Sequence, residues 1–346
     1  MPRETVERYL SAMEREIEEA PYLLPEETVV SVFFGGGTPT LLLPSDVERL
    51  LSLLRKKYAI SPSAEITVEA NPKTGNEEKL RAFLAAGVNR LSIGMQSFVD
   101  KELSLLGRLH TAKEGIAFFH AARNAGFKNI NIDLIYAIPT QTRESLKKTL
   151  DTALSLCPEH ISAYGLILEE GTDFFKNKDN ILWQTDEEEA DFYETVSSTL
   201  ASSGYEHYEI SNYARKGFRS CHNMGYWQSR PYLGFGASAA SLYGGKRVTN
   251  TRDLDAYISD PTNAVVEVEQ MNAENSLFDY VMMALRTSDG ISESDFFARF
   301  GFSFYQSKKA EIDRFVAIGY MSHDGSCTRF TSKGFYVSSA ILVEIL

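Results

Sequence analysis

The chain has 346 residues, of which 43% are hydrophobic and 24% are charged, and this composition suits a globular protein with one large and one small domain. Its formal net charge of −12 argues against a broad nucleic-acid surface, which needs positive charge. No apolar run is long enough for a membrane span and no signal peptide is visible, so we expect a cytoplasmic protein that is not transmembrane.

The first 170 residues alternate between predicted helices and predicted strands. Apolar residues at helical spacing predict helices over 4–20, 44–57, 76–86, 112–125 and 143–156. Apolar runs predict strands over 29–34, 64–71, 90–96, 129–136 and 160–168. Each strand is nearly continuous in its hydrophobicity, which is typical of parallel strands covered on both faces. This indicates an α/β fold of βα units, and the pattern leaves open whether they form a barrel or a part-barrel.

The pattern changes after Gly171. A helix is predicted over 185–202, an aromatic strand-like segment over 205–214, a loop-like stretch over 221–227 and a small-residue loop over 233–240. Three further helices, over 273–287, 292–299 and 304–318, precede two short strands around Asp324-Gly325, which is a winged-helix outline. We therefore expect three domains: a βα part-barrel over 1–170, an extension over 171–270 and a winged-helix-like domain over 271–346.

The winged-helix outline raises the question of DNA binding. Residues 271–346 contain nine acidic and seven basic side chains. The positive surface that nucleic acid requires is therefore missing, and we expect no nucleic-acid partner.

The segment VVSVFFGGGTP, residues 29–39, joins a buried strand directly to three glycines. Gly35, Gly36 and Gly37 lack Cβ atoms, so a ligand can approach the backbone closely. The loop is neither a P-loop nor a dinucleotide-binding turn. A tight strand-to-helix turn without a ligand is the alternative interpretation.

Polar side chains recur at the carboxyl ends of the predicted strands, the edge where α/β proteins place their sites. They are Thr38, Glu69, Asn71, Gln96, Ser97 and Asp133, with Arg108 on the segment after the third strand. An unpaired carboxylate inside an apolar strand is costly. Glu69 and Asp133 therefore meet either a cationic or hydroxyl-rich ligand or an internal arginine.

A second cluster lies in CHNMGYW, residues 221–227. His222 stands between Cys221 and the aromatic pair Tyr226 and Trp227. Histidine with flanking aromatics suits axial ligation of a flat iron macrocycle, although a histidine with satisfied hydrogen bonds and a purely structural role is the alternative. The three cysteines, Cys157, Cys221 and Cys327, are far apart, which indicates a reducing compartment, and they have no metal-ligand spacing.

Together these motifs resemble the oxygen-independent coproporphyrinogen III oxidase-like family of radical S-adenosylmethionine (SAM) proteins. The matching stretches cover nearly the whole chain and are FFGGGTPTLL, EITVEANP, NRLSIGMQSF, LLGRLH, NINIDLIYAIPTQT and HISAYGLILEEGT. The phrase YEISNYA followed by CHNMGYW is similar to the HNxxYW signature of the haem chaperone (HemW-type) branch.

The resemblance implies a partial (β/α)6 barrel with SAM at the carboxyl edge of its strands. By motif, Gly36, Gly37 and Thr38 would meet the methionine end of SAM through backbone groups. The ribose and carboxylate of SAM would be held by Glu69, Gln96, Arg108 and Asp133. Ile167 would lie near the adenine, and His222 would be the haem-binding residue.

The chain also departs from this family. Its CxxxCxxC motif, which holds a [4Fe–4S] cluster through three thiolates, is absent, and so is the strand before it; the sequence starts at roughly the residue after that motif. We therefore expect no metal-ligand set and five strands rather than six. Ala137 replaces a usual glycine, and Ala240 replaces a common histidine.

The first hypothesis is a haem chaperone-like protein that binds haem and hands it to an unidentified acceptor protein. The second is coproporphyrinogen III oxidation by radical decarboxylation in porphyrin biosynthesis, and the third is a cluster-free binding relative. The HNMGYW stretch favours the first hypothesis. Whether the chain is an enzyme is left open, because the cluster cysteines are absent.

Overall fold

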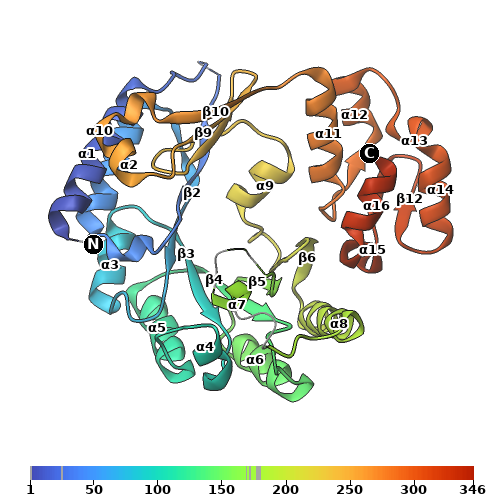
Figure 1. Cartoon of the computed structure of the whole chain (residues 1–346), viewed down its shortest axis with the longest axis horizontal. Helices are drawn as coiled ribbons and strands as arrows, with labels where there is room; N and C mark the ends of the chain where they lie inside the picture. The colour runs from blue at the N-terminus through green and yellow to red at the C-terminus, as the bar shows by residue number, and fades with distance from the viewer. Residues whose placement is uncertain (1, 25, 169, 171–172, 177–180) are drawn as a thin grey trace.

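A curled seven-stranded sheet dominates this computed structural model, which describes residues 2–24, 26–168, 170, 173–176 and 181–346. The sheet forms a half-barrel whose convex side is covered by helices (Figure 1). Two smaller three-stranded sheets and a helical C-terminal module follow. The predicted fold class, an α/β part-barrel with a small C-terminal domain, is confirmed.

Five parallel strands in chain order make up most of the large sheet. They are β1 (Val29–Phe34), β2 (Ile60–Ala70), β3 (Arg90–Gln96), β4 (Asn129–Tyr136) and β5 (His160–Gly165). All five were predicted, but β2 begins four residues earlier than expected and β5 ends before 168. The predicted boundary between residues 170 and 171 adjoins residues 171–172, which lie outside the described residues.

The two faces of these strands differ in composition, although β3 is buried on both faces, as predicted. Val68, Leu91 and Ile132 belong to the main hydrophobic cluster, which also contains Phe83 and Phe119 of the outer helices. The alternate residues of the same strands are polar and line the concave face. Because successive side chains on a strand point to opposite faces, the outer helices pack against only half of them. The other half is largely polar, and several of these residues, such as Ser92 and Asn131, are also buried.

Two antiparallel strands, β6 (Glu206–Glu209) and β7 (Asn212–Ala214), complete the large sheet in the order β5-β7-β6. The predicted strand-like segment 205–214 is therefore a hairpin. It doubles back because Ser211 N–H donates to the Glu209 carboxylate at 3.0 Å and Asn212 contacts the same group, which stabilises a tight turn.

The outer helices agree with the predicted ranges to within one residue, and one short helix, α4, was not predicted. They are α1 (Arg3–Glu19), α2 (Pro44–Lys57), α3 (Glu77–Ala85), α4 (Asp100–Leu105), α5 (Ala112–Ala125), α6 (Arg143–Ser155) and α8 (Asp186–Ser202). Thr111, Thr142 and Thr185 cap α5, α6 and α8 through their hydroxyls. Within the described ranges, no helix has the length and apolar character to cross a membrane.

The middle of the chain differs most from the sequence prediction. The stretch expected as a loop at 221–227 is a helix, α9 (Cys221–Trp227), with Ser220 as its N-cap. No strands were predicted between 240 and 270, yet a sheet in the order β10-β9-β8 lies there, formed by β8 (Ala240–Tyr243), β9 (Lys246–Asn250) and β10 (Val265–Gln270). Helix α10 (Leu254–Ser259) connects β9 to β10 and packs against α1.

The C-terminal module has its own hydrophobic cluster, centred on Phe296, Phe304 and Ile312. Its helices are α11 (Ala273–Ala284), α12 (Glu293–Phe300), α13 (Phe304–Ser307), α14 (Lys309–Ala317), α15 (Ser332–Tyr336) and α16 (Ser338–Ile345). Its sheet has the order β11-β13-β12, with β11 (Ile291–Ser292), β12 (Met321–His323) and β13 (Cys327–Phe330). The predicted helix 304–318 is divided into two, and α15 and α16 were not predicted.

Candidate functional site

Strand register brings the polar residues of the concave face into neighbouring positions. Glu69 of β2 pairs with Ser92 of β3, and Asp133 of β4 pairs with Gly94 on one side and Ser162 of β5 on the other. Paired residues of adjacent strands point to the same face of a sheet. Glu69 and Asp133, predicted from their positions at the strand ends, therefore face one common space.

That space is a cavity of about 380 Å³. Its lining includes Glu69, Gln96 and Asp133, together with Phe33 of β1 and Asn223 of α9. The backbone of Gln96 is left-handed, with φ of 67°, at an irregularity in the pairing of β3 with β4. This conformation is rare outside glycine and marks a locally constrained strand end.

The glycine-rich loop runs from β1 to the rim of this cavity. Gly36 and Gly37 have φ of 80° and 62°, which other residues rarely adopt, and a Cβ at either position would meet no neighbour within 4 Å. Gly36 N–H donates to Glu69 Oε2 at 3.1 Å. The loop is thus held against the carboxylate while its outer side stays open.

Two further predicted residues lie beside the loop, and both contact Asn71. The Asn71 amide donates to Thr38 Oγ1 at 2.8 Å, and its oxygen accepts from Arg108 at 3.5 Å. Neither Thr38 nor Arg108 is among the residues that line the cavity. Ser97, which the sequence also suggested, is buried elsewhere, where it donates to Glu102 at 2.5 Å.

The carboxylates at the cavity are held in an unfavourable environment for charge. Burial raises the pKa of Glu69, and the nearby Asp133 carboxylate raises it further, while the Gly36 N–H opposes the shift. Burial also raises the pKa of Asp133, although Asn131 and Ser162 oppose it by hydrogen bonding. A cationic or hydroxyl-bearing ligand would relieve both groups.

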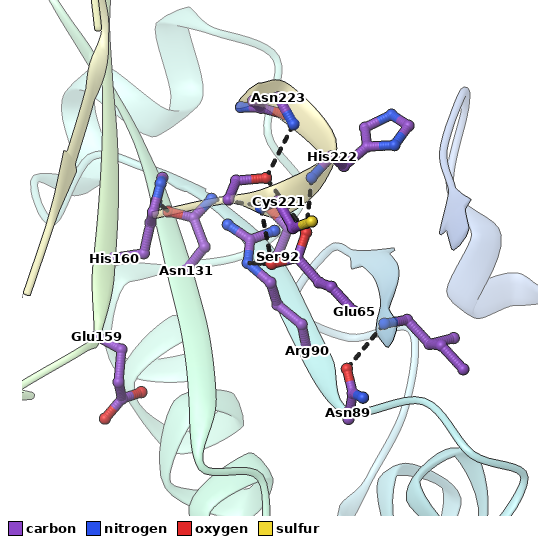
Figure 2. A network of polar contacts seen from close by, with 12 residues as sticks. Glu65, Asn89, Arg90, Ser92, Asn131, Glu159, His160, Cys221, His222 and Asn223 are labelled. Carbon is purple, nitrogen blue, oxygen red and sulfur yellow. Dashed lines mark hydrogen bonds and ion pairs between the residues drawn. The ribbon is translucent and has the colours of Figure 1, made fainter. Parts of the chain in front are cut away.

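Helix α9 is attached to the barrel wall by Glu65, a residue that the sequence analysis missed. Glu65 of β2 accepts from Cys221 N–H at 3.2 Å, from His222 N–H at 3.1 Å and from the Ser220 hydroxyl at 3.4 Å (Figure 2). The carboxylate therefore satisfies the free N–H groups at the start of α9 and complements the helix dipole. The sequence did contain a signal for this residue, because Glu65 lies four residues before Glu69 and therefore on the same face of β2.

Arg90 and His160 extend this attachment across the sheet. Arg90 is 2% exposed, and its Nε lies 3.7 Å from Glu65 Oε2. His160 is fully buried between Asn131 Oδ1 at 2.6 Å and the Tyr208 hydroxyl at 2.7 Å. The same hydroxyl accepts from Ser220 N–H at 3.2 Å. Side chains from β3, β4, β5 and β6 thus converge on the N-terminus of α9.

The other end of α9 is attached through another carboxylate, and this one is buried. Glu209 of β6 is 1% exposed, and the indole of Trp227 hydrogen-bonds to it. Burial raises the pKa of Glu209, and the bonds from Asn212, Ser211 and Trp227 oppose that shift. Buried polar groups at both ends therefore fix the helix that carries the HNMGYW sequence.

His222 points away from this network (Figure 2). Its ring stacks on Phe33 with centroids 4.4 Å apart and meets the edge of Tyr226 at 4.9 Å. Burial, with a smaller contribution from the charge of Arg90, lowers the pKa of His222 to about 4. The imidazole is therefore neutral near pH 7. Among the described residues, its ring nitrogens have no hydrogen-bond partner, and it does not line the barrel cavity.

The remaining predicted positions are placed as follows. Ile167 lies beyond the end of β5 and is 78% exposed, outside the cavity lining. Ala137 has φ of 57°, the left-handed conformation for which glycine is the usual residue. Ala240 begins β8, and its carbonyl oxygen would lie 2.1 Å from a Cβ added to Gly234.

The three cysteines are free thiols. Over the described part of the chain, no three His, Cys, Asp or Glu side chains group in a way that could hold a metal ion. These residues therefore do not fit an iron–sulfur cluster, which needs clustered thiolates.

The chain is similar to known proteins over nearly its whole length. Residues 2–153 match the Radical SAM superfamily, and residues 271–337 match the HemN C-terminal domain. The heme chaperone HemW of Bacillus subtilis is 35% identical over 95% of this chain and 88% of that protein. HemW of Lactococcus lactis is 32% identical over 92% and 85%. Mouse radical S-adenosyl methionine domain-containing protein 1, mitochondrial, is 33% identical over 92% and 76%.

A solved structure extends the likeness to three dimensions. Coproporphyrinogen III oxidase (HemN) from Escherichia coli, a radical SAM enzyme, superposes with a TM-score of 0.83 at 25% identity, covering 99% of this chain and 84% of that one.

Proposed function

The chain belongs to the HemW family of radical SAM proteins, and from this premise we propose that it binds haem through helix α9 and transfers it to an acceptor protein. One observation carries the proposal. The HNMGYW helix is attached at its two ends by the carboxylates of Glu65 and Glu209, while the His222 imidazole is neutral and has no hydrogen-bond partner among the described residues. A neutral imidazole nitrogen is the form that ligates iron.

The aromatic neighbours of His222 support the same function. Phe33 and Tyr226 flank the imidazole, and flat apolar rings of this kind suit packing against a conjugated macrocycle. In the described structure Phe33 stacks on one face of the imidazole, and Tyr226 meets it edge-on. Haem would therefore displace Phe33 or Tyr226 on binding.

A haem titration followed at the Soret band tests this proposal. We expect a saturable one-to-one spectral shift that His222→Ala weakens by at least about tenfold, since the variant loses the axial ligand. His120→Ala is the matched control, because His120 is exposed on α5. Haem binding that is equally strong in the His222 and His120 variants would refute the assignment of His222.

For the barrel cavity, we propose SAM as the ligand. Membership in the radical SAM superfamily implies SAM and a [4Fe–4S] cluster. The carboxylates Glu69 and Asp133 suit the ribose hydroxyls and the amino group, Gln96 and Arg108 suit the ligand's carboxylate, and backbone groups of Gly36, Gly37 and Thr38 suit its methionine end. Ile167, exposed after β5, would cover the adenine.

Unlike SAM, the [4Fe–4S] cluster finds no matching set of ligands among the described residues. Because the described residues do not group three thiolates, we assign no step of SAM cleavage to them. What the cavity residues can do is hold and orient a zwitterionic, hydroxyl-bearing ligand and keep it partly shielded from water.

Coproporphyrinogen III oxidation is the second candidate, and the structural likeness to the Escherichia coli oxidase favours it. The two functions differ in product. Formation of vinyl groups from coproporphyrinogen in the presence of SAM and a reductant would support the oxidase. Haem binding without that product, lost on His222→Ala, would support the chaperone.

A further inference from the structure

A second cavity, of about 240 Å³, begins at the C-terminal end of α9. Its walls come from the loop after α9, from the hairpin of β8 and β9, and from helices α11 and α12. Helix α9 also contacts α11 directly, and Figure 1 shows α9 between the β8–β10 region and α11. The cavity therefore lies where the middle of the chain meets the C-terminal module, apart from the barrel cavity.

The aromatic side chains connect this cavity to His222. Tyr226 lines the cavity and meets the His222 ring edge-on at 4.9 Å, since residues four apart share one side of a helix. Tyr226 also meets Tyr232, another lining residue, at 4.7 Å. A flat ligand that contacts His222 and replaces Tyr226 would extend into this space.

The cavity carries positive charge that the described structure leaves unpaired. Three arginines line it, and Arg247 is neutralised by ion pairs with Glu269 and Asp279. Within the described residues, the guanidinium groups of Arg230 and Arg299 form no ion pair, and that of Arg299 lies over the Tyr280 ring at 4.7 Å. Two such arginines beside one cavity provide a site for carboxylates.

Ser229 gives an independent indication of a ligand-binding site. Its hydroxyl oxygen is buried without a hydrogen-bond partner in the described part of the chain, and the residue is part of the cavity lining. Its backbone is left-handed, with φ of 52°, which costs free energy for a residue other than glycine. A buried unsatisfied hydroxyl in a folded protein calls for an explanation, and a ligand oxygen would satisfy it.

We propose that this cavity binds the carboxylate-bearing edge of the tetrapyrrole, with Arg230 and Arg299 paired to its propionates and Ser229 donating to one of them. The inference rests on the proposed haem function and specifies how the ligand is oriented. The iron faces His222, and the propionates lie toward the C-terminal module.

Titrations with haem and with haem dimethyl ester, whose propionates are neutral, test this orientation. We expect the unsubstituted protein to bind haem about tenfold more tightly than the ester, and Arg230→Gln/Arg299→Gln to reduce haem affinity about tenfold without changing ester affinity. Arg8→Gln is the matched control, because Arg8 is an exposed arginine on α1, which contributes no residue to the cavity. Circular dichroism spectra verify that each variant is folded.

The possible outcomes separate this inference from the proposed function. If the double variant binds haem like the unsubstituted protein, or loses haem and ester affinity equally, the propionate site is refuted. That result would leave haem binding through His222 untouched, because the titration of His222→Ala tests it separately. If the unsubstituted protein shows no saturable haem binding, both the function and this site are refuted.

Discussion

The concave face of the half-barrel carries two groups of polar side chains that differ in their partners. Nearer the start of the strands, Glu65 and Arg90 lie close to each other, and Glu65 bonds to the first N–H groups of α9. Nearer the carboxyl ends, Glu69 and Asp133 border an open cavity, and their pKa values are raised by burial. The same strands thus build an anchor at one end and a binding site at the other.

The difference shows how to separate structural from ligand-binding carboxylates. Glu65 and Glu69 are four residues apart on one strand and one face, so position alone does not distinguish them. Glu65 is satisfied by groups of the chain itself, whereas Glu69 receives one backbone N–H and faces a second carboxylate. Substitution of Glu65 should therefore lower the stability of the fold, and substitution of Glu69 should lower the affinity for the ligand.

The largest effect is expected from Glu65→Ala. The substitution leaves the Arg90 guanidinium buried without its carboxylate and the N-terminus of α9 without its acceptor. We expect a loss of about 3 kcal/mol in the free energy of unfolding, measured by urea denaturation. Haem affinity should fall as well, because His222 is carried by the helix that is released.

Glu65→Gln is the matched control for that experiment. Glutamine keeps one acceptor oxygen for α9 but loses the charge opposite Arg90, so we expect a smaller loss of stability than with alanine. If Glu65→Ala were as stable as the unsubstituted protein, the attachment of α9 through Glu65 would not contribute to the stability of the fold.

At the cavity end, Asp133→Asn should affect binding rather than folding. The substitution replaces a carboxylate, whose pKa is raised by burial, with a neutral amide of similar size. Because burying the charged form is costly, its loss should change the free energy of unfolding by no more than about 1 kcal/mol. We expect SAM affinity, measured by equilibrium dialysis, to fall about tenfold through loss of a charged hydrogen-bond acceptor. Unchanged SAM affinity would contradict the assignment of the cavity, and Asp151→Asn on the exposed side of α6 provides the control.

The smallest effect concerns pH. The pKa of His222 is about 4 in the folded protein against about 6.5 in an unfolded chain, so the unfolded chain binds the extra proton between these values. The stability that depends on neutral His222 is therefore complete above about pH 6.5 and declines as the pH falls toward 4. Between pH 7 and pH 6 we expect the unsubstituted protein to lose about 0.7 kcal/mol more than His222→Phe, measured by urea denaturation. An identical loss in both proteins would show that His222 is not shielded in this way.

The sequence by itself determined the α/β class, the five parallel strands and the carboxylates at the strand ends. Parallel strands place their carboxyl ends at one edge, so Glu69, Gln96 and Asp133 were predictable as neighbours without coordinates. The glycine-rich loop was equally recognisable, because three consecutive glycines after a strand permit backbone conformations that other residues avoid.

The position of His222 and the second cavity were decided only by tertiary structure. CHNMGYW contains asparagine and glycine, which are weak helix formers, and seven residues are too few for a helix to be stable alone. It is helical because Glu65, distant in sequence, satisfies its first N–H groups. The cavity at Arg230 likewise needs a loop, a hairpin and a helix from separate segments, and long-range contacts of this kind have no local signal in the sequence.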